Sequence, residues 1–231
     1  MAAPPEARLG PAAGYISPPA VRRITFTAAG ALVEGTAGPG STVRLGAPDG
    51  EAHTARAAAS GQWRILLEPA VRPRIFGLSM SDKRKVQGEG YVLVLPKGPG
   101  VILRAGAGAE VLEPGASARI LALDFDSDGG AVVSGIVQPN SALSVRSQGR
   151  PVGEGRSDAA GRFYTALNQP LENGPQLIEV VCGDVTLRAQ IEVGPAPGAG
   201  GSVMQVARVG GGLRIDWLTP GGGVQSTVLI G

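Results

Sequence analysis

An internal repeat constrains this chain more than any other feature of its sequence. Residues 30–67 align with residues 130–167 without a gap. The identical pairs are Gly30/Gly130, Ala31/Ala131, Val33/Val133, Gly35/Gly135, Pro39/Pro139, Ser41/Ser141, Arg56/Arg156, Ala59/Ala159, Gly61/Gly161 and Leu67/Leu167. Because about one hundred residues is a common size for a domain with its own core, the repeat predicts two copies of one structural unit.

The residues inside the repeat have the spacing of β-strands. Apolar residues alternate with polar ones at Val43 and Leu45, and again at Leu143 and Val145, as in a strand with one buried face. In both copies a small-residue turn ending in glycine precedes an aromatic residue, Trp63 or Phe163. We therefore expect these two aromatic side chains to occupy equivalent buried positions.

The composition favours an all-β fold. Glycine (37 residues) and proline (19 residues) are abundant, but 43% of the residues are hydrophobic and only 17% are charged, which is enough apolar material for buried cores. Candidate helical stretches are interrupted by glycine or proline, or are rich in valine, isoleucine and threonine. Short strands joined by tight turns are the prediction that fits the whole chain.

The repeat resembles the tandem bacterial immunoglobulin-like (Big-type) domains of exported envelope and surface proteins. The resemblance lies in the pattern V-x-G-x-x-x-P-x-S-x-[VL]-x-[VL], at Val33–Leu45 and Val133–Val145, followed by G-x-[WF] at Gly61–Trp63 and Gly161–Phe163. It implies a sandwich fold, a location outside the cytoplasm and a role as spacer, scaffold or adhesive unit.

The predicted fold is all-β, with two immunoglobulin-like β-sandwiches in tandem and a small C-terminal β-meander. The expected boundaries are an Ala/Pro-rich N-terminal arm at 1–20, the first sandwich at 21–105, a linker at 106–115, the second sandwich at 116–194, a Gly/Pro linker at 195–201 and a three-stranded β-meander at 202–231.

The C-terminal segment needs a surface to pack against. Leu213, Ile215 and Trp217 alternate with Arg214 and Asp216, but some thirty residues are too few for an independent core. We expect the segment to pack on an immunoglobulin-like sheet, either in its own chain or in a neighbouring one. The predicted interaction residues are Leu213, Ile215, Trp217 and Ile230.

One short motif could carry metal chemistry. Asp124, Asp126 and Asp128, followed by Gly129, match the opening of a calcium loop, but Gly135 stands where a closing glutamate is required. The alternative is a strand end followed by a hairpin turn, and we predict that calcium does not change the stability.

Other site chemistry is scarce. His53 is the only histidine and Cys182 the only cysteine, so multi-histidine metal sites and intrachain disulfides are excluded. We expect His53 to be solvated and Cys182 to be a buried thiol. No cofactor and no enzyme activity are predicted.

The leading functional hypothesis is a non-catalytic structural or interaction protein of a bacterial cell envelope or surface assembly. Its partners would be other envelope proteins or copies of itself. The alternative is a carbohydrate or peptidoglycan binder, for which Tyr15, Tyr91 and Tyr164 are the candidate exposed aromatic residues. A net charge of +2 without a broad basic face argues against nucleic acid. No signal peptide and no membrane-spanning segment are expected.

Overall fold

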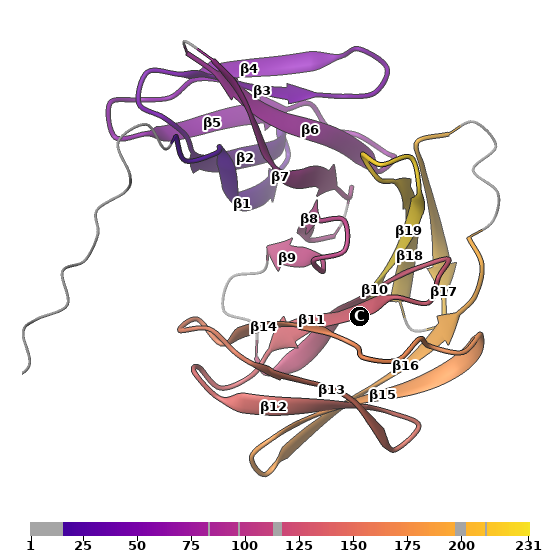
Figure 1. Cartoon of the computed structure of the whole chain (residues 1–231). Helices are drawn as coiled ribbons and strands as arrows, with labels where there is room; N and C mark the ends of the chain where they lie inside the picture. The colour runs from indigo at the N-terminus through magenta and orange to yellow at the C-terminus, as the bar shows by residue number, and fades with distance from the viewer. Residues whose placement is uncertain (1–15, 83, 97, 113–116, 197–201, 211) are drawn as a thin grey trace, which may run out of the picture.

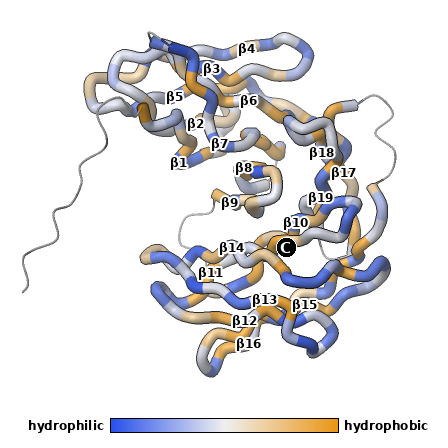
Figure 2. Tube along the Cα trace, in the orientation of Figure 1, coloured by the Kyte–Doolittle hydropathy of each residue, from blue (hydrophilic) through white to orange (hydrophobic). Residues whose placement is uncertain are grey.

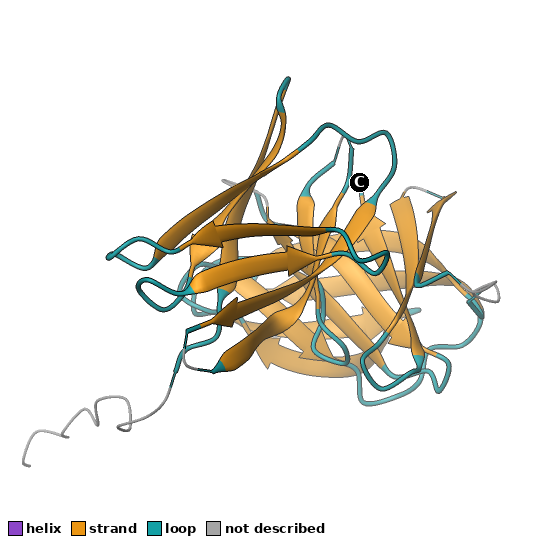
Figure 3. Ribbon diagram, turned by 90° about the horizontal axis from the view of Figure 1, so that it is seen from above, coloured by secondary structure: helices purple, strands orange, loops and turns teal. Residues whose placement is uncertain are grey.

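The computed structural model describes residues 16–82, 84–96, 98–112, 117–196, 202–210 and 212–231. Every regular element among these residues is a β-strand, and turns or loops join the strands (Figure 3). Figure 2 shows hydrophobic and hydrophilic residues interspersed along the strands. The all-β prediction is therefore confirmed.

The first sandwich consists of two sheets (Figure 1). One sheet has the order β1-β2-β5 and the other the order β4-β3-β6-β7-β8-β9. The strands are β1 (Ala20–Thr27), β2 (Gly30–Thr36), β3 (Thr42–Gly46), β4 (Ala52–Arg56), β5 (Gln62–Leu67), β6 (Arg74–Ser81), β7 (Lys85–Val94), β8 (Gly100–Leu103) and β9 (Glu110–Leu112). Apolar residues from both sheets, including Val33, Trp63 and Phe76, form the core between them.

The second sandwich repeats the first seven strands in the same spatial order. Its strands are β10 (Arg119–Asp126), β11 (Ala131–Ile136), β12 (Ala142–Ser147), β13 (Arg150–Arg156), β14 (Arg162–Ala166), β15 (Gly174–Cys182) and β16 (Val185–Val193). One sheet has the order β13-β12-β15-β16, and the other begins β14-β11-β10. The two immunoglobulin-like sandwiches predicted from the repeat are thus present.

The C-terminal residues form a meander that enlarges a sheet of the second sandwich. Its strands are β17 (Met204–Val209), β18 (Gly212–Leu218) and β19 (Val224–Ile230), and β19 pairs with β10 in antiparallel register. The sheet order is therefore β14-β11-β10-β19-β18-β17. The C-terminal segment was expected to pack on a sheet of its own chain or of a neighbouring one. In this structure it packs on a sheet of its own chain.

The expected linkers and arm are only partly described. Within 106–115, residues 110–112 form β9, and 113–115 lie outside the described residues. Residues 197–201 of the second linker and 1–15 of the N-terminal arm also lie outside them.

The glycine of the repeat is explained by the aromatic residue opposite it. Gly35 pairs with Trp63 across β2 and β5, and Gly135 pairs with Phe163 across β11 and β14. A Cβ atom at Gly135 would lie 2.8 Å from the Phe163 ring and would overlap the carbonyl oxygen of Arg119. Both aromatic side chains are buried, with exposed fractions of 4% and 1%, so their predicted equivalence is confirmed.

Substituting this glycine is expected to be costly. Gly135→Ala should lower the free energy of unfolding by about 1–3 kcal/mol, because the new methyl group has no space beside the Phe163 ring. Denaturant unfolding followed by circular dichroism measures the change. The matched control is Gly194→Ala, where no atom lies within 4 Å of the added Cβ and the expected change is below about 0.5 kcal/mol. Equal stability of the two variants would contradict this explanation.

A third hydrophobic core joins the two sandwiches. Its members come from β6 to β9 on one side and from β10, β18 and β19 on the other. The buried residues are Ile75, Leu93, Leu95, Val101, Leu103, Ala109, Val111, Leu121, Ala122, Ile215, Trp217 and Leu229. The sandwiches therefore share buried surface, and the C-terminal meander supplies part of it.

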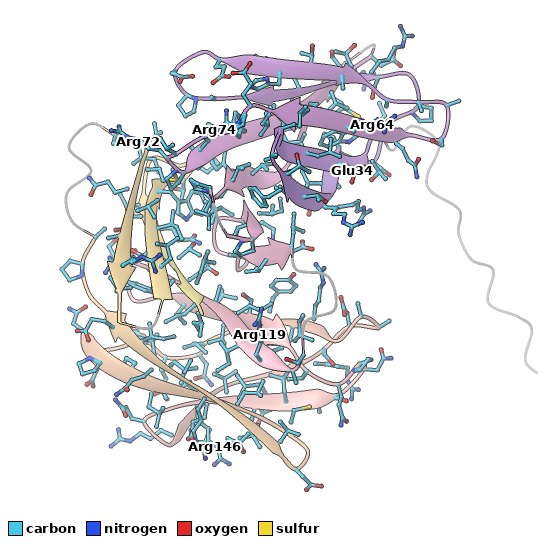
Figure 4. All side chains as sticks on the ribbon, turned by 180° about the vertical axis from the view of Figure 1, so that it is seen from behind. Glu34, Arg64, Arg72, Arg74, Arg119 and Arg146 are labelled. Atoms are coloured by element: carbon cyan, nitrogen blue, oxygen red, sulfur yellow. The ribbon has the colours of Figure 1, made fainter. Side chains whose placement is uncertain are left out.

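The sheet faces that take no part in the third core are more polar than the two faces that meet there. Glu34 and Arg64 lie on the outer face of β2 and β5 (Figure 4), where the second sandwich has Ser134 and Tyr164 at the joined face. Two positions of the joined face, Tyr91 and Leu93, correspond by strand register to the polar residues Arg188 and Gln190 in the second sandwich. These polar faces cap the pair in the way that terminal repeats cap a repeat protein.

Candidate functional site

A buried polar cluster lies beside the third core, at the junction of the two sandwiches. The Asp124 carboxylate accepts hydrogen bonds from the Thr227 hydroxyl (2.5 Å), the Gln225 amide nitrogen (3.1 Å) and the backbone N–H of Ala109 (2.7 Å). Thr227 also accepts a hydrogen bond from Trp217 Nε1, at 3.1 Å. Asp124 thus connects the segment after β8 to β19 of the meander.

The pKa of Asp124 reflects its burial. Desolvation raises the pKa from 3.8 to about 6, although the hydrogen bonds from Thr227, Ala109 and Gln225 and the charge of Arg104 lower it. The folded state therefore binds this proton more tightly than the unfolded state. This contribution to stability is complete below about pH 4 and is lost as the pH rises through about 6.

An Asp124→Asn variant should lack this pH dependence. Between pH 4 and pH 7 the wild type should lose about 2 kcal/mol of unfolding free energy that the variant does not lose, since one pKa unit corresponds to about 1.4 kcal/mol. Urea unfolding of both proteins at the two pH values measures this difference. An exposed aspartate variant, Asp184→Asn, serves as the control. Parallel pH profiles for wild type and Asp124→Asn would show that the carboxylate is ionised throughout this range.

A second buried polar group lies on the other face of the meander. Arg214 Nε donates to Asp216 Oδ1 at 2.8 Å, and Ser226 donates to the same oxygen at 2.6 Å. Arg214 Nη2 donates to Ser226 (3.0 Å) and to the carbonyl oxygen of Gly194 (2.9 Å). The structure buries this ion pair beside the chain segment that follows β16.

A groove of about 710 Å³ lies next to the junction, on the outer face of the first sandwich. Residues of β3, β6 and β7 line it, together with the segment after β8 and Pro220 in the turn between β18 and β19. Figure 1 shows this turn, in yellow, beside the edge of the first sandwich. The groove is thus built from parts of the chain that are distant in sequence.

The four predicted interaction residues face the interior of their own chain. Ile215 and Trp217 have exposed fractions of 0% and 1% and belong to the third core, and Leu213 packs against it half-buried. Ile230 packs against the core of the second sandwich. A role for them in binding another molecule remains a prediction.

The aspartates of the calcium-like motif bind protein donors. Asp124 is committed to the junction, and Asp126 Oδ1 accepts the backbone N–H groups of Asp128 and Gly130 in a hairpin turn, each at 3.0 Å. Nearly equal melting temperatures with millimolar calcium and with chelator are the expected result. A rise of several degrees with calcium would identify the aspartates as ligands.

The remaining residues singled out in the sequence have ordinary surroundings. Cys182 is buried as expected. His53 is half-buried rather than solvated: its Nε2 lies 2.8 Å from a Glu51 oxygen, and its ring packs edge-on against the core residue Phe76, because the side chain points inward from the edge strand β4. Within the described ranges, no group of three or more His, Cys, Asp or Glu side chains could hold a metal ion.

The candidate aromatic residues divide between three places. Tyr91 is half-buried in the groove, and its ring meets Trp217 edge-to-face at 5.8 Å. The guanidinium carbon of Arg104 lies 4.2 Å from the centre of the Tyr164 ring. Burial raises the pKa of the Tyr164 hydroxyl. Tyr15 lies outside the described residues. Among the described elements, no helix is long and apolar enough to cross a membrane.

Comparison with known proteins gives few relatives. No protein-family model matches the chain, and no curated protein sequence matches it. Among solved structures, it is similar to the BSP domain of a biofilm-associated protein, with 15% identity and a TM-score of 0.27 over 79% of this chain and 30% of that one. It is also similar to the central fibronectin-III array of RIM-binding protein, with 13% identity and a TM-score of 0.29 over 87% of this chain and 71% of that one. The chain thus spans about a third of the first structure's length.

Proposed function

We propose that this chain is a non-catalytic structural and interaction protein of a bacterial cell-envelope or surface assembly, located outside the cytoplasm. The observation that carries the proposal is the third core, because burial of Trp217 and its neighbours between the sandwiches fixes their relative position. A two-domain unit held in this way can keep binding surfaces at a set distance, which a flexible tandem cannot do.

The surfaces available to partners are sheet edges and polar faces. β1 and β16 are edge strands. Their counterparts in the other sandwich, β10 and β7, are not edge strands, because β19 pairs with β10 and β8 pairs with β7. Val185 on β16 is 40% exposed and Leu66 on β5 is 52% exposed. Unpaired edges can accept a strand from another protein, and the partners proposed are other envelope proteins or further copies of this chain.

Crosslinking in native cells tests this proposal. A photoreactive residue at Leu66 or at Val185 should crosslink to envelope proteins or to a second copy, while one at buried Phe163 should not. Cell fractionation of the same cultures should recover the chain outside the cytoplasm. A chain found only in the cytoplasm, or crosslinking equally from the buried position, would overturn the proposal.

The second candidate is a carbohydrate binder. Tyr91 in the groove favours it, since an aromatic ring with a polar edge can pack against the apolar face of a sugar while its hydroxyl stays hydrated. The same groove leads to a more specific inference.

A further inference from the structure

We infer that the groove on the first sandwich binds an acidic oligosaccharide. The inference rests on the second candidate function and is independent of the scaffold role. Three features support it: a floor that is open at Gly77, one oriented aromatic ring, and cationic side chains around them. Each is described below from the residues that form it.

Glycines open the floor of the groove. Gly46 and Gly77 are neighbours on β3 and β6, at positions where the second sandwich carries Arg146 and Glu179. A Cβ atom at Gly77 would have only ordinary contacts, at 3.8 and 4.0 Å, so this position is empty space rather than a tight fit. The corresponding face of the second sandwich is filled by side chains, and the open floor is therefore specific to the first copy.

A bulge shapes one side of the groove. The register between β6 and β7 shifts between Gly77 and Ser79, whereas the corresponding β15–β16 ladder is continuous. The extra residues include Gly90, whose φ of 77° and whose close approach to the Leu103 carbonyl exclude a side chain. Gly90 thus lies against Leu103 and Arg104, beside the groove. Bulges of this kind often redirect side chains at binding sites.

One aromatic ring has a fixed orientation. Tyr91 pairs with Gly77 across the strands, so no side chain stands opposite its ring on β6. Trp217 holds the ring edge-to-face, with an interplanar angle of 81°. Its hydroxyl has no hydrogen-bond partner among the described residues. A pyranose ring can therefore lie over the floor with its C–H face against Tyr91.

The charge of the lining favours an anionic sugar. Arg44, Lys85 and Arg104 line the groove, against the single carboxylate of Glu89, and of the three cations the Arg104 guanidinium lies over Tyr164. The Arg44 guanidinium lies directly over Gly46, at a place that a Cβ atom would occupy. Arginine binds carboxylates through paired, charge-assisted hydrogen bonds. A neutral sugar would offer no counter-charge to Arg44 and Lys85.

An acidic peptide fits the groove less well. The groove lies on the face of a sheet, where β3, β6 and β7 already use their backbone groups in the ladders between them. A peptide strand would therefore gain no main-chain hydrogen bonds there, and main-chain pairing is the usual source of its affinity for sheets. Hydroxyl and carboxylate groups of a sugar need only the side chains that the groove provides.

Isothermal titration of the full chain tests the inference, with tetragalacturonic acid as probe and maltotetraose as its neutral counterpart. The acidic tetrasaccharide should bind at least tenfold more tightly. Arg44→Ala should weaken its binding about tenfold, the effect of losing roughly 1.4 kcal/mol of charge-assisted hydrogen bonding. Gly77→Val should abolish binding while leaving the melting temperature nearly unchanged, because valine fits the open floor and the strand. Tyr91→Leu should weaken the binding of both sugars.

Arg146→Ala is the matched control, since Arg146 is also an exposed arginine on the outer face of its sandwich, far from the groove (Figure 4). It should bind the probe as the wild type does. Absence of binding by the wild type, binding that survives Gly77→Val, or equal losses in Arg44→Ala and Arg146→Ala would each overturn the inference. Tighter binding of tetraglutamate at the same groove would identify a peptide site instead. None of these outcomes affects the crosslinking result, so failure of the glycan site and failure of the scaffold role are distinguishable.

Discussion

Replacing Trp217 with alanine is expected to lower the free energy of unfolding by about 3–5 kcal/mol, the usual cost of truncating a large buried aromatic side chain. Trp217 is 1% exposed at the centre of the third core. Its removal leaves a cavity between the sandwiches, takes away the support of Tyr91 and deprives Thr227 of a hydrogen-bond donor. Urea unfolding followed by circular dichroism measures the loss.

Two further variants show which part of that loss comes from the side-chain volume and which from the hydrogen bond. Trp217→Phe keeps most of the volume but loses the hydrogen bond to Thr227, and should cost about 1–2 kcal/mol. Val203→Ala, at a 39% exposed position just before β17, should change stability by less than about 0.5 kcal/mol. A Trp217→Ala protein as stable as the wild type would mean that the third core does not hold the sandwiches together.

Removing the carboxylate of Asp216 should have a similarly large effect. Arg214 is 8% exposed and depends on Asp216 and Ser226 for most of its hydrogen bonds. Asp216→Ala leaves a buried guanidinium without its counter-charge, for which about 3–5 kcal/mol is expected. The unfolding midpoint in urea should fall accordingly, with β17 to β19 exchanging their amide hydrogens first.

Replacing both residues of the ion pair separates the contribution of the charges to stability from the contribution of the volume that the side chains fill. Arg214→Met combined with Asp216→Leu should restore much of the stability, because a buried ion pair is often no more stabilising than apolar residues of similar size. Arg188→Ala breaks an ion pair whose arginine is 62% exposed, and should cost less than about 1 kcal/mol. If Asp216→Ala is no worse than Arg188→Ala, the charges at Arg214 and Asp216 are solvated.

The repeat allowed the sandwiches to be predicted because its conserved residues have strict local causes. Gly35 and Gly135 must lack side chains beside an aromatic ring, and Trp63 and Phe163 must fill a core. Such requirements leave the same residue types at the same spacing in both copies. The strand alternation around Val43 and Leu143 then fixes which face is buried.

The junction could not be predicted because its residues have no local signature. Asp124 follows an apolar strand and precedes two more aspartates, so the sequence offered only the opening of a calcium loop or a strand end before a hairpin turn. Two of its actual partners, Gln225 and Thr227, lie about one hundred residues away on β19. Leu93 and Val101 resemble residues of any buried strand. The groove also depends on the missing side chains of Gly46 and Gly77, which become meaningful only when the strand register shows Arg146 and Glu179 at the same positions of the second sandwich.

The pairing of β10 with β19 also has a consequence for synthesis on the ribosome. β10 is complete after residue 126, but β19 begins only at residue 224. At about 5–20 residues per second, the nascent chain carries an unpaired strand edge for several seconds to some twenty seconds after β10 has emerged. Unpaired edges recruit other strands and promote aggregation. A chain released before residue 224 is therefore a hazard to its neighbours as well as an incomplete protein.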